Sequence, residues 1–148
     1  MLKDLLTKSM IATNVSVNNW VEAIEFGGAI LEKKGVIEHR YIEAMIEGVN
    51  KFGPYIVIAP GIALAHANPK SGVKEIGISL ITLDKGINFG HDENDPVRIV
   101  ISLAAVDHET HIKSLSSLAR LLNDENFVEM VLNSNNYEIS EYIKKIEI

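Results

Sequence analysis

The stretch from residue 76 to residue 105, IGISLITLDKGINFGHDENDPVRIVISLAA, decides the fold. Its two ends, 76–83 and 98–105, are almost continuously apolar and rich in isoleucine and leucine, which predicts two strands. Strands of this kind usually lie in a sheet that helices cover on both faces. Between them, Gly86 and the acidic segment 91–96 indicate loops.

Two helices are predicted upstream of these strands. The first begins at an asparagine cap, Asn18 or Asn19, and ends at Gly35. The second runs from about residue 38 to residue 52, and Gly53-Pro54 stops it. Its apolar stripe consists of Tyr41, Ile42, Met45, Ile46 and Val49.

Further elements complete the layout. Short β-prone segments at 10–15 and 55–59 predict additional strands. A third helix begins after Asp107, and two shorter helices are expected at about 125–132 and 139–146. The apolar positions expected on the third helix are Ile112, Leu115, Leu118 or Ala119, and Leu122. The predicted fold class is therefore α/β, a single-domain sandwich with a central mixed β-sheet flanked by helices.

Length and composition fit one soluble domain spanning residues 1–148. The chain has no cysteine, which excludes disulfides and thiolate metal sites and suits a reducing cytoplasm. The net charge of −6 and the lack of a basic cluster argue against a nucleic-acid partner. No apolar run approaches the roughly 20 residues of a membrane span, so we expect a cytoplasmic protein without membrane insertion.

Histidine is the best remaining candidate for chemistry, and His66 stands out among the five histidines. It lies in PGIALAHANP, residues 60–69, where almost all neighbours are small, apolar or turn-forming. Loss of hydration there lowers the pKa of an imidazole, so the neutral nucleophile predominates near pH 7. Gly61 and the alanines leave room for a bulky anion or for a partner's backbone. The residues alone do not exclude that His66 is a structural histidine whose ring only makes hydrogen bonds in the core.

His111 is the second candidate. If Asp107 caps the third helix, His111 falls in its first turn, where unpaired backbone N–H groups and the helix dipole favour an anion. A histidine there can donate an N–H to a phosphoryl oxygen. The alternative is that His111 only begins the half-buried stripe of this helix.

The other three histidines are expected to be surface residues. His39 follows a glutamate at a helix start, and His108 precedes the buried part of the third helix. His91 heads an acidic loop that lacks the regular oxygen spacing of a calcium loop, so a solvated turn is expected there rather than a metal site.

Three segments, 60–69, 86–97 and 103–122, occur in an order and spacing that resemble the enzyme IIA domains of the bacterial sugar phosphotransferase system (PTS). The resemblance is to the mannitol/fructose class, and within that class to the ascorbate-type IIA component. It extends from the helix containing Trp20 to about Phe127.

The resemblance implies a mannitol/fructose-type IIA fold and a phosphoryl carrier serving uptake of ascorbate or a related sugar. It implies that His66 accepts the phosphoryl group from the carrier protein HPr and that His111 is the second active-site histidine. The family passes the group to a IIB component, so the membrane permease IIC is an indirect partner. Such a route needs no metal, nucleotide or other cofactor.

The sequence departs from the family pattern at two places. Ala65 stands where many relatives have proline before the phosphorylated histidine, so the backbone lacks that restraint. Residues 48–52 lack the arginine of mannitol-type members, which favours the ascorbate type.

Three alternative functions remain open from the sequence. They are a regulatory, nitrogen-type IIA protein, a metal-dependent hydrolase that uses both histidines and the acidic loop, and a binding module without chemistry. For a carrier, an apolar rim that meets partners is expected at Ile62, Leu64 and residues 55–58.

Overall fold

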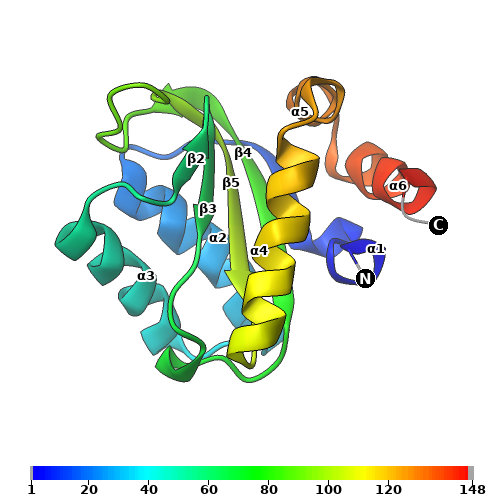
Figure 1. Cartoon of the computed structure of the whole chain (residues 1–148). Helices are drawn as coiled ribbons and strands as arrows, with labels where there is room; N and C mark the ends of the chain where they lie inside the picture. The colour runs from blue at the N-terminus through cyan, green and yellow to red at the C-terminus, as the bar shows by residue number, and fades with distance from the viewer. Residues whose placement is uncertain (1, 147–148) are drawn as a thin grey trace.

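A computed structural model of the chain describes residues 2–146. Its helices and strands confirm the expected α/β class, with a central mixed sheet flanked by helices (Figure 1). In chain order they are α1 (Leu2–Leu5), β1 (Ile11–Val15), α2 (Trp20–Lys34), α3 (His39–Phe52), β2 (Val57–Ala59), β3 (Ile62–Ala65), β4 (Gly77–Ile87), β5 (Val97–Ala104), α4 (His108–Leu122), α5 (Glu125–Leu132) and α6 (Asn136–Ile146).

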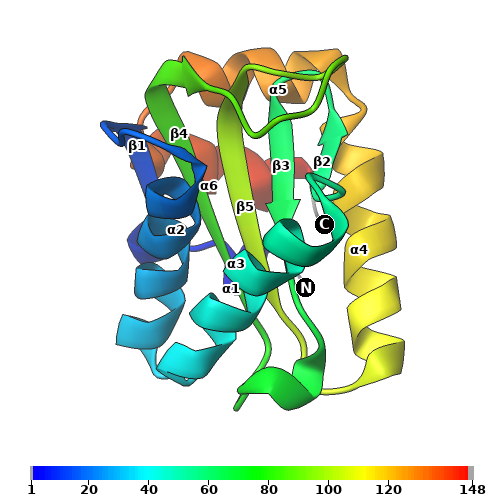
Figure 2. The same ribbon diagram turned by 90° about the vertical axis from the view of Figure 1, so that its left-hand side faces the viewer.

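The sheet has five strands in the order β1-β4-β5-β3-β2. β1 runs parallel to β4 and β3 parallel to β5, while the β4–β5 and β2–β3 pairs are antiparallel. Helices α2 and α3 cover one face (Figure 2), and α4 lies on the other face together with α1 and α6 (Figure 1). The two apolar runs that predicted strands are β4 and β5, which have a neighbouring strand on each side and are buried accordingly.

The helix ends follow the caps expected from the sequence. The Asn19 side chain accepts a hydrogen bond from the Glu22 backbone N–H at the start of α2, and Gly35 ends that helix with φ of 86°. At the start of α4, the Asp107 carboxylate accepts the Thr110 N–H at 2.7 Å. The predicted cap that places His111 in the first turn is therefore present.

Two local expectations are wrong. The segment 55–59 is a strand only from Val57, because Tyr55 lies in a turn whose N–H donates to the Gly53 carbonyl. Ile112 is 53% exposed, because the first half of α4 buries His111 and Ser114 in place of the expected Ile112 and Leu115, whereas Leu118 and Leu122 are buried as expected. The residues that α4 buries are His111, Ser114, Leu118 and Leu122.

Within residues 2–146, no helix is both long and apolar enough to span a membrane.

Candidate active site

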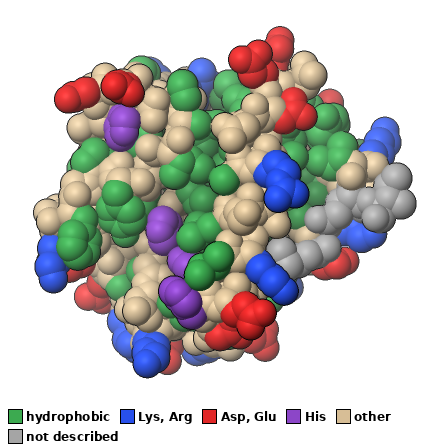
Figure 3. All heavy atoms as spheres, viewed as in Figure 1, with side chains coloured by type: hydrophobic (Ala, Val, Ile, Leu, Met, Phe, Trp, Pro, Cys, Tyr) green, Lys and Arg blue, Asp and Glu red, His purple; other side chains and the backbone are tan. Residues whose placement is uncertain are grey.

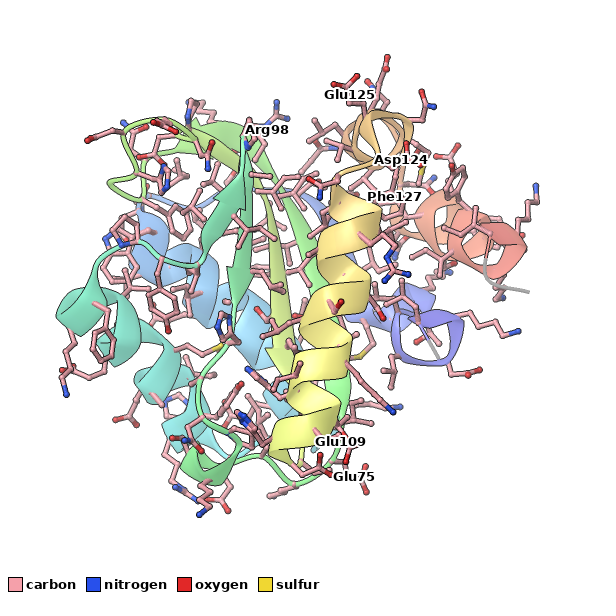
Figure 4. All side chains as sticks on the ribbon, in the orientation of Figure 1. Glu75, Arg98, Glu109, Asp124, Glu125 and Phe127 are labelled. Carbon is pink, nitrogen blue, oxygen red and sulfur yellow. The ribbon has the colours of Figure 1, made fainter. Side chains whose placement is uncertain are left out.

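The sheet topology brings two distant segments together at one edge. β3 and β5 are parallel neighbours, paired through Ala65 and Ser102, so their carboxyl ends meet at the same end of the sheet. His66 directly follows β3, and α4 begins shortly after β5. Figure 4 shows Glu109, in the first turn of α4, at this end and Arg98 at the other. Ligand sites in α/β proteins commonly form at such carboxyl ends.

The His66 ring is held in one tautomer. Its Nδ1 lies 2.8 Å from the Leu64 carbonyl oxygen. A carbonyl oxygen only accepts hydrogen bonds, so Nδ1 carries the proton and Nε2 carries the lone pair. Nε2 makes no hydrogen bond in the described structure, and it is not enclosed by other protein atoms. His66 therefore presents an accessible, unprotonated nitrogen.

Burial favours the uncharged form of this ring. Desolvation is the main influence and lowers the pKa of His66, while the hydrogen bond to the Leu64 carbonyl partly opposes it. The Tyr55 ring meets the imidazole edge to face, with ring centroids 5.5 Å apart. The lowered pKa expected from the sequence is therefore present, and its physical source is burial of the ring.

His111 lies directly against His66, with ring centroids 5.3 Å apart. His111 is only 9% exposed and lies on the buried face of α4, deeper than the half-buried position considered from the sequence. Burial first, and then the nearby His66 and His108, lower the pKa of His111. Within the described residues its Nδ1 is buried without a partner, whereas Nε2 is not enclosed in this way. Nε2 is thus the atom through which His111 can act.

A pocket of about 220 Å³ opens beside His66. It lies between the β2–β3 hairpin and α4, and its lining is apolar apart from His66 and one asparagine. The lining residues are Ile58, Ala59, Leu64, His66, Leu115, Ala119, Leu122 and Asn123. Figure 3 shows histidine side chains reaching the surface on this face of the molecule, with hydrophobic side chains beside them.

The apolar rim differs in part from the expected one. Ile62 and Leu64 are each only 2% exposed, because they belong to a strand with neighbours on both sides, so these two rim residues were predicted wrongly. Tyr55 and Ile58 are exposed as the rim requires, but Ile56 and Val57 between them are buried. Five exposed apolar side chains, which we call the apolar rim, lie on the segments that precede His66 or flank His111 in the chain: Phe52, Tyr55, Ile58, Val106 and Ile112. Of these, Tyr55 meets the His66 ring and Ile58 lines the pocket beside it.

The remaining histidines lie outside this cluster or at its border. His39 is exposed and its Nδ1 lies 3.0 Å from Glu32, which raises its pKa. His108 is exposed beside His111. His91 accepts the Asn94 N–H within its own loop. Over residues 2–146, no three histidine, aspartate or glutamate side chains are arranged to hold a metal ion.

The acidic loop is organised by its own backbone. The Asp95 carboxylate accepts the backbone N–H groups of Phe89, Gly90 and His91 at 2.8–3.0 Å. The Asp95 carboxylate is therefore occupied in shaping this turn.

One residue of the site was missed by sequence reasoning. Tyr41 of α3 is fully buried, and its hydroxyl accepts the Ala67 N–H at 3.0 Å and donates to the Leu103 carbonyl at 2.7 Å. The sequence placed Tyr41 only in an apolar stripe. The available signal was its hydroxyl, which needs a hydrogen-bond partner when the ring is buried.

Fold and site together define a small α/β domain with two neutral imidazoles in contact at the carboxyl ends of parallel strands. The family model described as "Phosphoenolpyruvate-dependent sugar phosphotransferase system, EIIA 2" matches residues 4–146, and the chain belongs to this family.

Known proteins resemble the chain over most of its length. The Ascorbate-specific PTS system EIIA component of Escherichia coli (strain K12) is 44% identical over 126 residues, 84% of this chain and 82% of that protein. The mannitol-specific cryptic phosphotransferase enzyme IIA CmtB from Escherichia coli has a similar structure, with a TM-score of 0.87, 33% identity and coverage of 97% and 98%. The enzyme IIAMTL in complex with phosphorylated enzyme IIBMTL, also from Escherichia coli, matches with a TM-score of 0.81, 28% identity and coverage of 93% and 95%. The sequence-based resemblance to the mannitol/fructose class is confirmed.

Proposed function

We propose that this chain carries a phosphoryl group on Nε2 of His66, taking it from phosphorylated HPr and passing it to a IIB component. The observation that carries the proposal is the contact between the His66 and His111 rings, whose centroids are 5.3 Å apart. Nε2 of each ring is accessible. In this proposal residues 1–148 act as one cytoplasmic IIA domain, and the membrane permease IIC is served only indirectly.

Acceptance of the group is a nucleophilic displacement at phosphorus. The lone pair on Nε2 of His66 forms the new N–P bond, while the bond from phosphorus to the donor's ring nitrogen breaks and its electron pair leaves with the donor. The reaction needs a neutral ring, which the lowered pKa of His66 supports. The ring becomes positively charged after attack, and the Leu64 carbonyl, which accepts its Nδ1–H, stabilises that charge.

His111 offsets the negative charge of the phosphoryl oxygens. A proton on Nε2 of His111 allows this nitrogen to donate a hydrogen bond toward a group on His66. The first turn of α4, which Asp107 caps, adds the positive end of the helix dipole at the same place. In this role His111 stabilises the phosphoryl group and does not attack it.

The apolar rim supports docking of two successive partners. Tyr55 meets the His66 ring and Ile58 lines the pocket beside it, so a protein that covers these residues also shields the reacting nitrogen from water. A small interface of this kind forms and dissociates readily, as a carrier requires.

The cargo is proposed from the relatives. The Escherichia coli relative that is 44% identical is named for ascorbate, and the mannitol-specific structure is 33% identical. We therefore propose an ascorbate-type IIB as the acceptor. Purified ascorbate-type and mannitol-type IIB proteins, offered separately to the phosphorylated chain, test this assignment; preferential transfer to the mannitol-type protein contradicts it.

Phosphoryl labelling tests the central proposal. Incubation with radiolabelled phosphoenolpyruvate, enzyme I and HPr is expected to give a base-stable, acid-labile label on the chain. His66→Ala is expected to accept no phosphoryl group. The control His39→Ala removes an exposed histidine outside the His66–His111 pair and is expected to keep full labelling. Normal labelling of His66→Ala contradicts the proposal.

Onward transfer distinguishes transport from regulation and tests His111. His111→Ala is expected to accept the group at a reduced level and to pass it to IIB poorly; unchanged transfer identifies His111 as a packing residue. A regulatory IIA protein also accepts the label on its histidine, but it has no IIB to which it transfers rapidly. Absence of transfer to any IIB therefore favours the regulatory alternative.

A further inference from the structure

The segment that carries His66 is tied down from the far side of the sheet. Tyr41 belongs to α3, which packs on the face opposite α4 (Figure 2). Its ring is fully buried, and its hydroxyl reaches past the end of β3. There it accepts the Ala67 N–H at 3.0 Å and donates to the Leu103 carbonyl oxygen at 2.7 Å. One oxygen atom thus connects the residue after His66 to the end of β5.

These bonds fix the backbone on which the imidazole depends. The Nδ1 bond reaches back to Leu64, two residues before His66, so the ring direction follows the backbone between residues 64 and 67. The upstream part of that backbone is held by pairing of β3 with β5, which ends at Ala65. Beyond Ala65 the pairing stops, and Ala67 is held by the Tyr41 hydroxyl.

A tyrosine is needed at position 41 for this purpose. A phenylalanine fills nearly the same volume in the core, but it leaves the Ala67 N–H and the Leu103 carbonyl without this partner. Burial raises the pKa of Tyr41 to about 12, so the hydroxyl stays protonated and both bonds persist at neutral pH. The hydroxyl lies behind the site, bonded to backbone atoms, and is therefore not itself a reacting group.

We propose that Tyr41 is a positioning residue for phosphoryl transfer: its hydroxyl ties Ala67 to β5 and thereby holds Nε2 of His66 in register with His111. This inference rests on the proposed role of His66. It predicts that loss of one hydroxyl, on the opposite side of the sheet from α4, slows the chemical step while leaving partner docking intact.

The test is Tyr41→Phe, with Tyr142→Phe as the matched control. Tyr142 is a partly buried tyrosine of α6 that packs against Phe127, away from the histidines. In single-turnover transfer from phosphorylated HPr, Tyr41→Phe is expected to lower the maximal rate about tenfold, since misplacement of a reacting group by about 1 Å can cost up to 10²-fold. The HPr concentration giving half the maximal rate stays unchanged, and Tyr142→Phe behaves as wild type.

Two further measurements separate positioning from mere stability. Rates are compared at a temperature where circular dichroism shows both variants folded, and ¹⁵N NMR reports the His66 tautomer. Positioning predicts a single Nδ1–H tautomer in the wild type and a mixture in Tyr41→Phe. A structural role predicts lower stability with rate and tautomer unchanged, and that result overturns the proposal.

Hydrogen exchange in the wild-type protein needs no variant. The Ala67 amide is expected to exchange far more slowly than the amide of the exposed neighbour Asn68, whose N–H donates no hydrogen bond in the described structure. Equally fast exchange at Ala67 also overturns the proposal. Normal phosphoryl labelling of His66→Ala, in contrast, contradicts the proposed function itself. Failure of the Tyr41 proposal and failure of the proposed function are therefore distinguishable.

Discussion

Mild acid is expected to destabilise the fold through the two histidines of the site. Burial lowers the pKa of His66 and of His111 below the ordinary value of 6.5, so the folded protein holds both rings uncharged. In the unfolded chain the same rings take up protons as the pH falls through 6.5. The unfolded state then binds more protons than the folded state, and the free energy of unfolding decreases.

Proton linkage gives the sign and the size of this dependence of stability on pH. Stability from this source is fully present above about pH 6.5 and is lost as the pH falls toward the lowered pKa values. Each ring contributes a slope of at most about 1.4 kcal/mol per pH unit, so the pair contributes at most about 2.7 kcal/mol per unit. His66 is partly exposed, which makes this figure a ceiling. His39 acts in the opposite direction, because Glu32 raises its pKa at the surface.

Urea unfolding at several pH values between 7.5 and 5.5 measures this effect. The range avoids Glu38 and Asp107, whose lowered pKa values place their titration below that of ordinary carboxyl groups. We expect His66→Gln and His111→Gln each to flatten the dependence of stability on pH, and the double variant to flatten it most. If the double variant keeps the wild-type slope, the two rings are not held uncharged by burial and the electrostatic account of the site is refuted.

Three other changes have definite expected outcomes. Asp107→Ala removes the cap on Thr110 and is expected to cost about 1 kcal/mol in urea unfolding and to slow transfer to IIB; an unchanged unfolding midpoint contradicts the cap. Gly28→Ala places a methyl group 2.6 Å from Ile42, between α2 and α3. The free energy of unfolding is expected to fall by about 1–3 kcal/mol in the same assay. Unchanged stability shows that α2 and α3 move apart at no cost. Ile112→Asp changes an exposed rim residue and is expected to raise the half-saturating HPr concentration about tenfold, equivalent to 1.4 kcal/mol, at unchanged stability; normal saturation removes Ile112 from the docking surface.

The elements with strong local signals were predictable from the sequence. β4 and β5 are apolar runs, and α2 and α4 carry side-chain caps that the residue types themselves indicate. The β2–β3 hairpin was not separated from its surroundings. Its turn uses Gly61 with φ of 76°, and that residue bonds through its N–H to Asn94 and through its carbonyl to Arg98. These partners lie more than 30 residues away, so no local pattern contains them.

The sequence named His66 and His111 as candidates, and only the family resemblance implied that they share a site. His66 was indicated by its small apolar neighbours and His111 by the cap at Asp107. They meet because β3 and β5 are adjacent and parallel, a property of the whole sheet. Alternation along the extended chain then directs Leu64 and His66 to the face that α4 covers, where both line the same pocket.

The environment of His66 answers two opposite requirements of the proposed reaction. A ring that attacks phosphorus must be neutral beforehand, and the same ring must tolerate positive charge while it holds the phosphoryl group. Burial alone satisfies the first requirement and makes the second costly. The Leu64 carbonyl favours the charged ring and thus acts against burial in setting the pKa of His66. Because desolvation is the larger influence, the resting ring stays neutral; because the carbonyl bond is already formed, no rearrangement is needed when the charge appears. The value of that bond depends on a fixed backbone from residue 64 to residue 67, which is where the Tyr41 hydroxyl is placed.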